Sequence, residues 1–173
     1  VQSLAQAGLS TSDVEIVNLQ HSDGKVALER GDVAAWAGLD PFMAQTELES
    51  GSRLIYRNLD FNSYGLLNAN EDFLRERPEV AQAVVNAYER ARAWILENPD
   101  AAVQTLATAA SISPEIARQQ LLTRTQLDID PVPGEAQRTV LARLLPTLVA
   151  DGLVRSEQEA QTALDTLFEP RFA

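Results

Sequence analysis

Hydrophobic positions in the first part of the chain follow strand-like patterns at four places. Residues 14–19 (VEIVNL) alternate apolar and polar side chains, as a strand with one covered face does. Residues 33–39 (VAAWAGL) are all apolar or small, which is typical of a strand buried on both faces. Residues 53–58 and 64–69 predict two further strands, separated by a loop at residues 60–63.

Short helices are predicted between these strands. Residues 1–8 and 22–31 have helical spacing of apolar positions and end in glycine. Ser22 or Asp23 is the expected cap of the second helix. A third helix should start at Asp40-Pro41, because Asp accepts hydrogen bonds from a free first turn and Pro has the backbone angle of that turn. No capping residue precedes the first helix, so the pattern predicts a chain that begins inside a helix.

From residue 70 onward nearly every pattern is helical. Residues 78–98 carry one apolar stripe, and Pro146 should kink or split a long helix over residues 135–150. Short strands alternating with helices, followed by about six helices, predict an α/β fold with a helical C-terminal half. The apolar stripe consists of Val80, Val84, Ala87, Tyr88, Ala91 and Ile95, and the other predicted helices span residues 70–77, 99–110, 113–124 and 156–168.

Composition narrows the possible functions. The 173 residues carry a net charge of −11, which argues against a nucleic-acid surface because phosphates are neutralised by clustered Lys and Arg. There is no cysteine, which excludes disulfides, thiolate metal sites and cysteine nucleophiles. Neither a membrane-spanning run nor the basic, apolar start of a signal peptide is present, so this stretch is typical of a soluble protein.

Catalytic motifs are hard to find in this sequence. The single histidine, His21, is followed by Ser22 and Asp23, but three adjacent residues at a turn point in different directions and do not form a triad. There is no second histidine for a metal site and no glycine-rich phosphate loop. We therefore expect no catalytic residue, no metal and no cofactor.

The best candidates for ligand binding are aromatic. In open α/β sheets ligands bind beyond the carboxyl ends of the strands, and Trp36 and Asp40 lie at the end of one predicted strand. Tyr64 and Gly65 start another predicted strand, where Gly65 would let a ligand or a backbone approach closely. The plainer alternatives are a core tryptophan, a helix-capping aspartate and a hairpin residue.

Three motifs together identify a family resemblance. ALERGDVAAWAGLDPF, then NSYGLLNANEDFLRERPEVAQAVVNAYERARAWILENPDAA, and finally LFEPRF resemble the aliphatic sulfonate, taurine and nitrate substrate-binding proteins of bacterial ABC transporters. The resemblance covers nearly all of the chain, and its middle segment is the most specific part.

The resemblance implies a type II periplasmic-binding-protein fold, in which two lobes, each a mixed sheet with flanking helices, close on a small ligand. Residues 1–125 would be an incomplete second α/β lobe. Residues 126–173 would be the C-terminal crossover and helices that pack toward a first, N-terminal lobe absent from this chain. In relatives a strand and a Ser-rich turn precede the first helix, whose N-terminal amides help to hold the anion.

The resemblance also assigns a ligand-binding set. Trp36 matches the family's aromatic residue, and Asp40-Pro41 match the end of the same motif; many sulfonate binders have a second Trp where this chain has Leu39. Trp36 and Phe42 would contact an alkyl group and Tyr64 would donate a hydroxyl, whereas Asp40 should cap its helix because it would repel an anion. Taurine binders tend to have an acid near Gly65, which argues against taurine. The full set is Trp36, Gly38, Asp40, Phe42, Tyr64 and Gly65.

The implied function is the solute-binding component of an ABC importer, without chemical conversion of its ligand. Its expected partners are a small anion such as an alkanesulfonate and the transporter permease, at the periplasmic or extracellular face of the membrane, with membrane contact only through an upstream lipid anchor. Two alternatives share the fold. One is the effector-binding sensor of a transcription regulator; the other is an enzyme of thiamine-precursor synthesis, which should carry catalytic His and Cys residues that this chain lacks.

Overall fold

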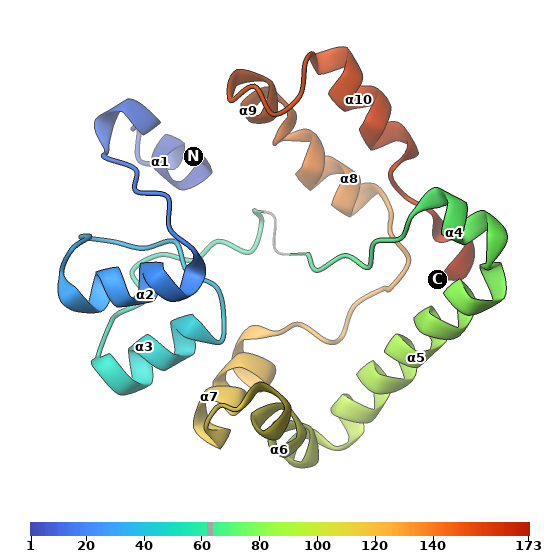
Figure 1. Ribbon diagram of the computed structural model, residues 1–173, viewed down its shortest axis with the longest axis horizontal. Helices are drawn as coiled ribbons and strands as arrows, with labels where there is room; N and C mark the ends of the chain where they lie inside the picture. Colours follow the sequence, from blue (N-terminus) through green and yellow to red (C-terminus); the bar gives the residue numbers. More distant parts are fainter. Residues whose placement is uncertain (62–63) are drawn as a thin grey trace. The chain divides into compact units, whose positions relative to one another are not determined.

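The computed structural model describes residues 1–61 and 64–173, which fall into two compact units (Figure 1). Each unit is built from two separate stretches of the chain. Unit 1 consists of Val1–Arg57 and Asn98–Gln126, and unit 2 of Asn58–Glu97 and Leu127–Ala173.

Unit 1 is centred on a helical hairpin. Its core consists of Val103 and Ala107 on one helix and Ala117 on the next, all buried, with Leu106, Ile112 and Leu121 packed around them. The preceding pair of helices, α2 and α3, pack against each other, and α3 also contacts α7. The elements of unit 1 are α1 (Gln2–Gln6), η1 (Thr11–Asp13), α2 (His21–Arg30), α3 (Phe42–Ser50), α6 (Pro99–Ala110), α7 (Pro114–Arg118) and η2 (Gln119–Arg124), a π-helical turn that continues α7.

Unit 2 has its core among its last three α-helices. Leu145, Ala160 and Leu164 are buried there, and the Arg138 guanidinium lies 5.5 Å from the centre of the Phe168 ring, which packs on the same cluster. The long helix α5 contacts α4 and the C-terminal turn η3. The elements of unit 2 are α4 (Glu71–Glu76), α5 (Pro78–Glu97), α8 (Glu135–Ala142), α9 (Leu145–Ala150), α10 (Glu157–Thr166) and η3 (Pro170–Phe172).

Local capping chemistry explains several helix ends. The side chains of Asn70, Ser113 and Ser156 each accept a hydrogen bond from a backbone N–H of the first turn of α4, α7 and α10. Gly31 and Gly51 end α2 and α3 with φ of 79° and 71°, left-handed angles that favour glycine. The predicted cap of α2 was wrong: His21 already begins that helix, so Ser22 and Asp23 lie inside its first turn.

The predicted long helix over residues 135–150 is split, as Pro146 required. α8 ends at Ala142, and α9 begins at Leu145 with Pro146 in its first turn. Proline has no backbone N–H to donate to the preceding turn, and at a first turn that donor is not needed. The helix is therefore interrupted at the position where the missing N–H of Pro146 costs no backbone hydrogen bond.

The predicted mixed sheet is not found among the described residues. Residues 14–19, 33–39, 53–58 and 64–69 are irregular segments, and no residue of 1–61 or 64–173 is in a β-strand. A strand is stabilised by backbone hydrogen bonds to a neighbouring strand, and none of these segments pairs with another. Many of their apolar side chains are exposed, for example Ile16 at 58% and Ile55 at 78%, whereas Val33 and Trp36 are half-buried. Asn62 and Ser63 of the predicted loop lie outside the described residues.

The helix over residues 78–98 forms as α5, but its apolar stripe is not a core. Val80, Val84 and Tyr88 are exposed, and only Ala81 of α5 is buried. Separately, none of the helices in the described part of the chain is both long and apolar enough to span a membrane.

Truncating a buried side chain of unit 1 should reveal how much its core stabilises the protein. Ile116 is 2% exposed on α7, so Ile116→Ala should lower the free energy of unfolding by about 2–5 kcal/mol through lost burial and a cavity. Leu153→Ala, at a side chain that is 70% exposed, should change it by less than about 0.5 kcal/mol. Urea unfolding followed by circular dichroism measures both values, and equal losses would contradict the assignment of the core.

Candidate functional site

The six residues predicted to bind ligand divide between the two units. Four of them belong to one short stretch of unit 1 that leads into α3, and two belong to unit 2. We call residues 36–42 the tryptophan segment. The four in unit 1 are Trp36, Gly38, Asp40 and Phe42; the two in unit 2 are Tyr64 and Gly65.

Trp36 is half-buried and packs against glycine backbone. A side-chain carbon at Gly24, in α2, would lie 2.3 Å from the indole Nε1. At Gly38 it would lie 2.6 Å from Trp36 Cζ3 and 2.7 Å from Cγ of Met43, in α3. Neither position has room for a larger residue, so the indole ring lies directly against the backbone of Gly24 and of Gly38.

The predicted cap of α3 is confirmed in part: the Asp40 side chain accepts from an amide of the first turn, but Pro41, expected in that turn, occupies the N-cap position. Asp40 Oδ1 accepts a hydrogen bond from the backbone N–H of Ala44 at 3.1 Å, and the cis Asp40–Pro41 peptide immediately precedes the helix. Phe42 is the first residue of α3 and is half-buried, while Leu39 is 57% exposed. The carboxylate of Asp40 therefore binds the Ala44 amide, and the exposed apolar side chain at this point is Leu39.

A second contact of Asp40 escaped sequence reasoning. The Arg124 guanidinium donates from Nη1 to Asp40 Oδ1 at 2.8 Å and from Nη2 to Glu47, and Gln119 Nε2 donates to the same Glu47 oxygen at 3.0 Å. The Arg124 side chain is only 7% exposed. Two carboxylates already neutralise it, so Arg124 is not available to a ligand anion. An arginine at the end of a helix is ordinary, and nothing in the pattern marked this one as buried.

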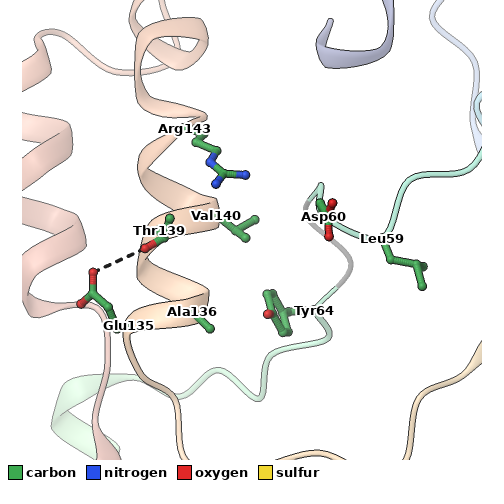
Figure 2. Close-up of a pocket in the computed structure, with 8 residues that line it drawn as sticks. All are labelled: Leu59, Asp60, Tyr64, Glu135, Ala136, Thr139, Val140 and Arg143. Carbon is green, nitrogen blue, oxygen red and sulfur yellow. Dashed lines mark hydrogen bonds between the residues drawn. The ribbon is translucent and has the colours of Figure 1, made fainter. Parts of the chain in front are cut away.

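Unit 2 contains a hollow of about 400 Å³ beside α8. Figure 2 shows Val140 of α8 and Arg143, the residue that follows the end of α8, on the side that is turned toward Asp60 and Tyr64. The remaining lining residues are Leu59, Glu135, Ala136 and Thr139. The hollow thus combines one predicted site residue, Tyr64, with apolar surface and with charges that sequence reasoning missed.

The charges of this hollow are arranged asymmetrically. Glu135 accepts a hydrogen bond from the Thr139 hydroxyl at 3.4 Å, and its carboxylate lies 3.9 Å from Arg138 Nε. Arg143 forms no ion pair within residues 1–61 and 64–173. Its guanidinium is the hollow's available cation, and Asp60 is the carboxylate that faces it. The spacing of Val140 and Arg143 predicts that both side chains point to the same side. The sequence does not predict which residues lie opposite them.

Gly65 does not line this hollow. A side-chain carbon there would meet no protein atom within 4 Å, so no part of the described protein makes the close approach that the glycine permits. Its role beside a ligand stays a prediction, as do those of Trp36, Gly38, Phe42 and Tyr64.

Catalytic and metal-binding side chains are sparse in the described residues. His21 is exposed at the start of α2, with Ser22 and Asp23 on the same turn. Over the described ranges, no three His, Asp or Glu side chains are grouped so that they could hold a metal ion.

One titrating group connects the two helices beside Trp36. The carboxylate of Glu29, in α2, is 3.0 Å from Lys25 Nζ and accepts a hydrogen bond of 2.8 Å from the Ser50 hydroxyl at the end of α3. These two contacts, Lys25 first, lower the pKa of Glu29 below its ordinary value of 4.5.

This lowered pKa predicts a pH dependence. Ionised Glu29 stabilises the fold above pH 4.5, and the contribution is lost as the pH falls through the lower pKa of the folded state. Glu29→Gln keeps the shape and removes the charge, so the variant should be less stable than wild type at pH 7, with a smaller further loss below pH 4.5. Urea unfolding across this pH range measures the difference, and parallel curves for the two proteins would refute it.

Packing of the indole against Gly24 predicts a spectroscopic effect. In a Trp94→Phe background, where Trp36 is the single tryptophan, Gly24→Ala should push the ring toward water and shift its emission to longer wavelength. The shift should occur even though alanine favours helix over glycine by about 1 kcal/mol. Gly65→Ala, with open space at its side-chain carbon, is the matched control and should leave the emission unchanged. Identical spectra for both variants would rule out the packing described above.

Comparison of the sequence with known proteins identifies its family. Residues 2–102, more than half of the chain, match the model of the family described as NMT1/THI5 like. A relative from Escherichia coli (strain K12), named "Putative aliphatic sulfonates-binding protein", is 26% identical over 136 residues, which cover 78% of this chain and 43% of the relative. A protein of the same name from Bacillus subtilis (strain 168) is 22% identical over 149 residues, 85% of this chain and 40% of the relative.

The chain therefore spans less than half the length of the curated relatives it matches. No solved structure matches it significantly. The family resemblance predicted from the three sequence motifs is confirmed by the family match and by both relatives. On this evidence, the chain belongs to the NMT1/THI5-like family.

Proposed function

We propose that the protein is the solute-binding component of an ABC importer and binds a small organic anion of the aliphatic sulfonate class without converting it. The observation that carries the proposal is the similarity, over more than three quarters of this chain, to two proteins named for binding aliphatic sulfonates. The transporter permease is the proposed protein partner, at the periplasmic or extracellular face of the membrane, with an upstream lipid anchor as the only membrane contact.

The chemistry of the described surfaces supports an anion with an alkyl tail. A sulfonate has three acceptor oxygens and one negative charge, which suit a guanidinium and a phenolic hydroxyl. The hollow beside α8 offers Arg143 and Tyr64 for such a head group, with Val140 as apolar surface. Separately from this hollow, Trp36 and Phe42 of unit 1 stay proposed apolar contacts because of the family resemblance. Gly38 and Gly65 would let the ligand approach the backbone.

Asp40 has a supporting part in this proposal. Its carboxylate is satisfied by the Ala44 amide and by Arg124, so it neither repels nor attracts a ligand strongly. We keep it in the proposed site as the residue that fixes the start of α3 beside Phe42. Tyr64, in contrast, lines the hollow of unit 2 (Figure 2), and its hydroxyl donates to no other residue of the described ranges.

The proposed mechanism is a change of population rather than a reaction. A ligand that contacts both lobes of the full-length protein binds the closed form more tightly than the open form and so shifts the equilibrium toward closure. The permease would then recognise the closed form. The alternative of a transcription regulator's sensor draws no support from the relatives, both of which are named as binding proteins.

Calorimetric titration of the full-length protein tests the ligand class. Alkanesulfonates should bind with a saturable heat, and taurine and nitrate serve as comparison ligands with a different charge or no alkyl group. No binding of any of the alkanesulfonates would contradict the proposed function.

The same titration tests the contribution of Arg143. Arg143→Gln should weaken alkanesulfonate binding by about tenfold or more, because a charge-assisted hydrogen bond is lost. Arg155→Gln is the matched control in unit 2, since Arg155 is 90% exposed and, among the described residues, pairs only with Glu159. Equal affinities of wild type and Arg143→Gln would remove Arg143 from the site and leave the ligand class intact.

A further inference from the structure

We infer that Arg124 is a positioning residue: through Asp40 it fixes the orientation of the tryptophan segment and of Trp36. The part of this inference that concerns ligand affinity rests on the proposed function, whereas the part that concerns Trp36 itself does not. Three features of unit 1 carry the inference, namely the geometry of the contacts of Arg124, the π-helical turn that presents it, and the packing between α3 and the indole ring.

The contacts of Arg124 are spread along α3. Nη1 donates to Asp40, just before the helix begins, and Nη2 donates to Glu47, near its middle. A single planar guanidinium therefore holds α3 at two points about seven residues apart. Two separated contacts restrain the rotation of the helix as well as its position, which one ion pair could not do.

The π-helical turn η2 explains why these contacts are possible. In such a turn the hydrogen bonds run from residue i to i+5, so side chains five positions apart come to the same side. Gln119 and Arg124 are separated by five positions, and both donate to the same oxygen of Glu47. In a regular α-helix these two side chains would point about 140° apart, because successive residues turn by about 100°. The unusual turn thus assembles the cluster.

Burial makes the arrangement stringent. The side chains of Arg124, Asp40 and Glu47 are 7%, 17% and 22% exposed. Removing one partner of such a cluster leaves a charge in a poorly hydrated place, which is more costly than the loss of a surface ion pair. The cluster therefore favours one arrangement of α3 against η2 over all nearby ones.

The position of α3 in turn determines the surroundings of Trp36. The indole contacts the backbone at Gly38, which lies two residues before Asp40, and the Met43 side chain of α3 reaches the same place. A shift of Asp40 would move Gly38 and Met43 together. Because the opposite support of the ring, Gly24, belongs to α2, such a shift would open the packing around Trp36.

Substitution of Arg124 by lysine tests this chain of contacts. Lysine keeps the positive charge but cannot donate in the fixed fork that reaches both carboxylates. In a full-length protein whose tryptophans other than Trp36 are replaced by phenylalanine, Arg124→Lys should shift the Trp36 emission to longer wavelength and increase its quenching by acrylamide, with unchanged helical circular dichroism. Alkanesulfonate affinity should fall by about tenfold.

Two controls separate positioning from a general loss of stability. Arg118→Lys changes the neighbouring exposed arginine of α7, which pairs with Asp100 at 2.6 Å, and should alter neither the emission nor the affinity. Ile116→Val destabilises the same unit without touching the cluster and should also leave the Trp36 emission unchanged. If Arg124→Lys does not fold, Glu47→Gln removes one of the two ion pairs, leaves Asp40 in place, and should give a smaller shift of the same sign.

The outcomes discriminate between the two proposals. An unchanged Trp36 emission in both Arg124→Lys and Glu47→Gln overturns the positioning role, and so does an equal shift in Ile116→Val. A shifted emission in a protein that binds no alkanesulfonate, even as wild type, supports the positioning role and overturns the proposed function instead.

Discussion

A buried guanidinium shared by two carboxylates determines how unit 1 presents its most distinctive segment. Arg124 joins the turn after α7 to both the start and the middle of α3. Charged groups are removed from water only where partners replace the water, and here both carboxylates and the Gln119 amide do so. The orientation of α3, the cap at Asp40 and the packing of Trp36 all follow from this one cluster.

The helical part of the fold could be predicted because its signals are local. Ser113 and Ser156 cap the helices that they precede, and Pro146 divides a helix at the predicted place. The predicted strands do not form among the described residues. The alternation in residues 14–19 indicates one face that could be buried, but a strand also needs a neighbouring strand to pair with, and a local pattern does not show whether one is present. Val14, Ile16 and Val17 are exposed.

The candidate site was predictable only in part, for a related reason. The sequence separated the role of Asp40, a helix cap, from that of Trp36, and the Ala44 hydrogen bond confirms the cap in part. It did not reveal Arg124, whose partners lie 84 and 77 residues away along the chain, nor the hollow that Arg143 lines together with Asp60. Such long-range pairs depend on packing between elements, which a local pattern does not encode.

Family membership and geometry support the same kind of function by independent routes. The family match covers residues 2–102 and includes the whole tryptophan segment and Tyr64, while Arg143 and the other α8-side residues of the hollow lie outside the matched range. The central claim is that Trp36, oriented by the Arg124 cluster, contacts an alkanesulfonate. Fluorescence titration with an alkanesulfonate, in a full-length protein whose tryptophans other than Trp36 are replaced by phenylalanine, tests it most directly. The account predicts a saturable change in Trp36 emission with the same midpoint as the calorimetric heat; saturable heat with no change in Trp36 emission would contradict it.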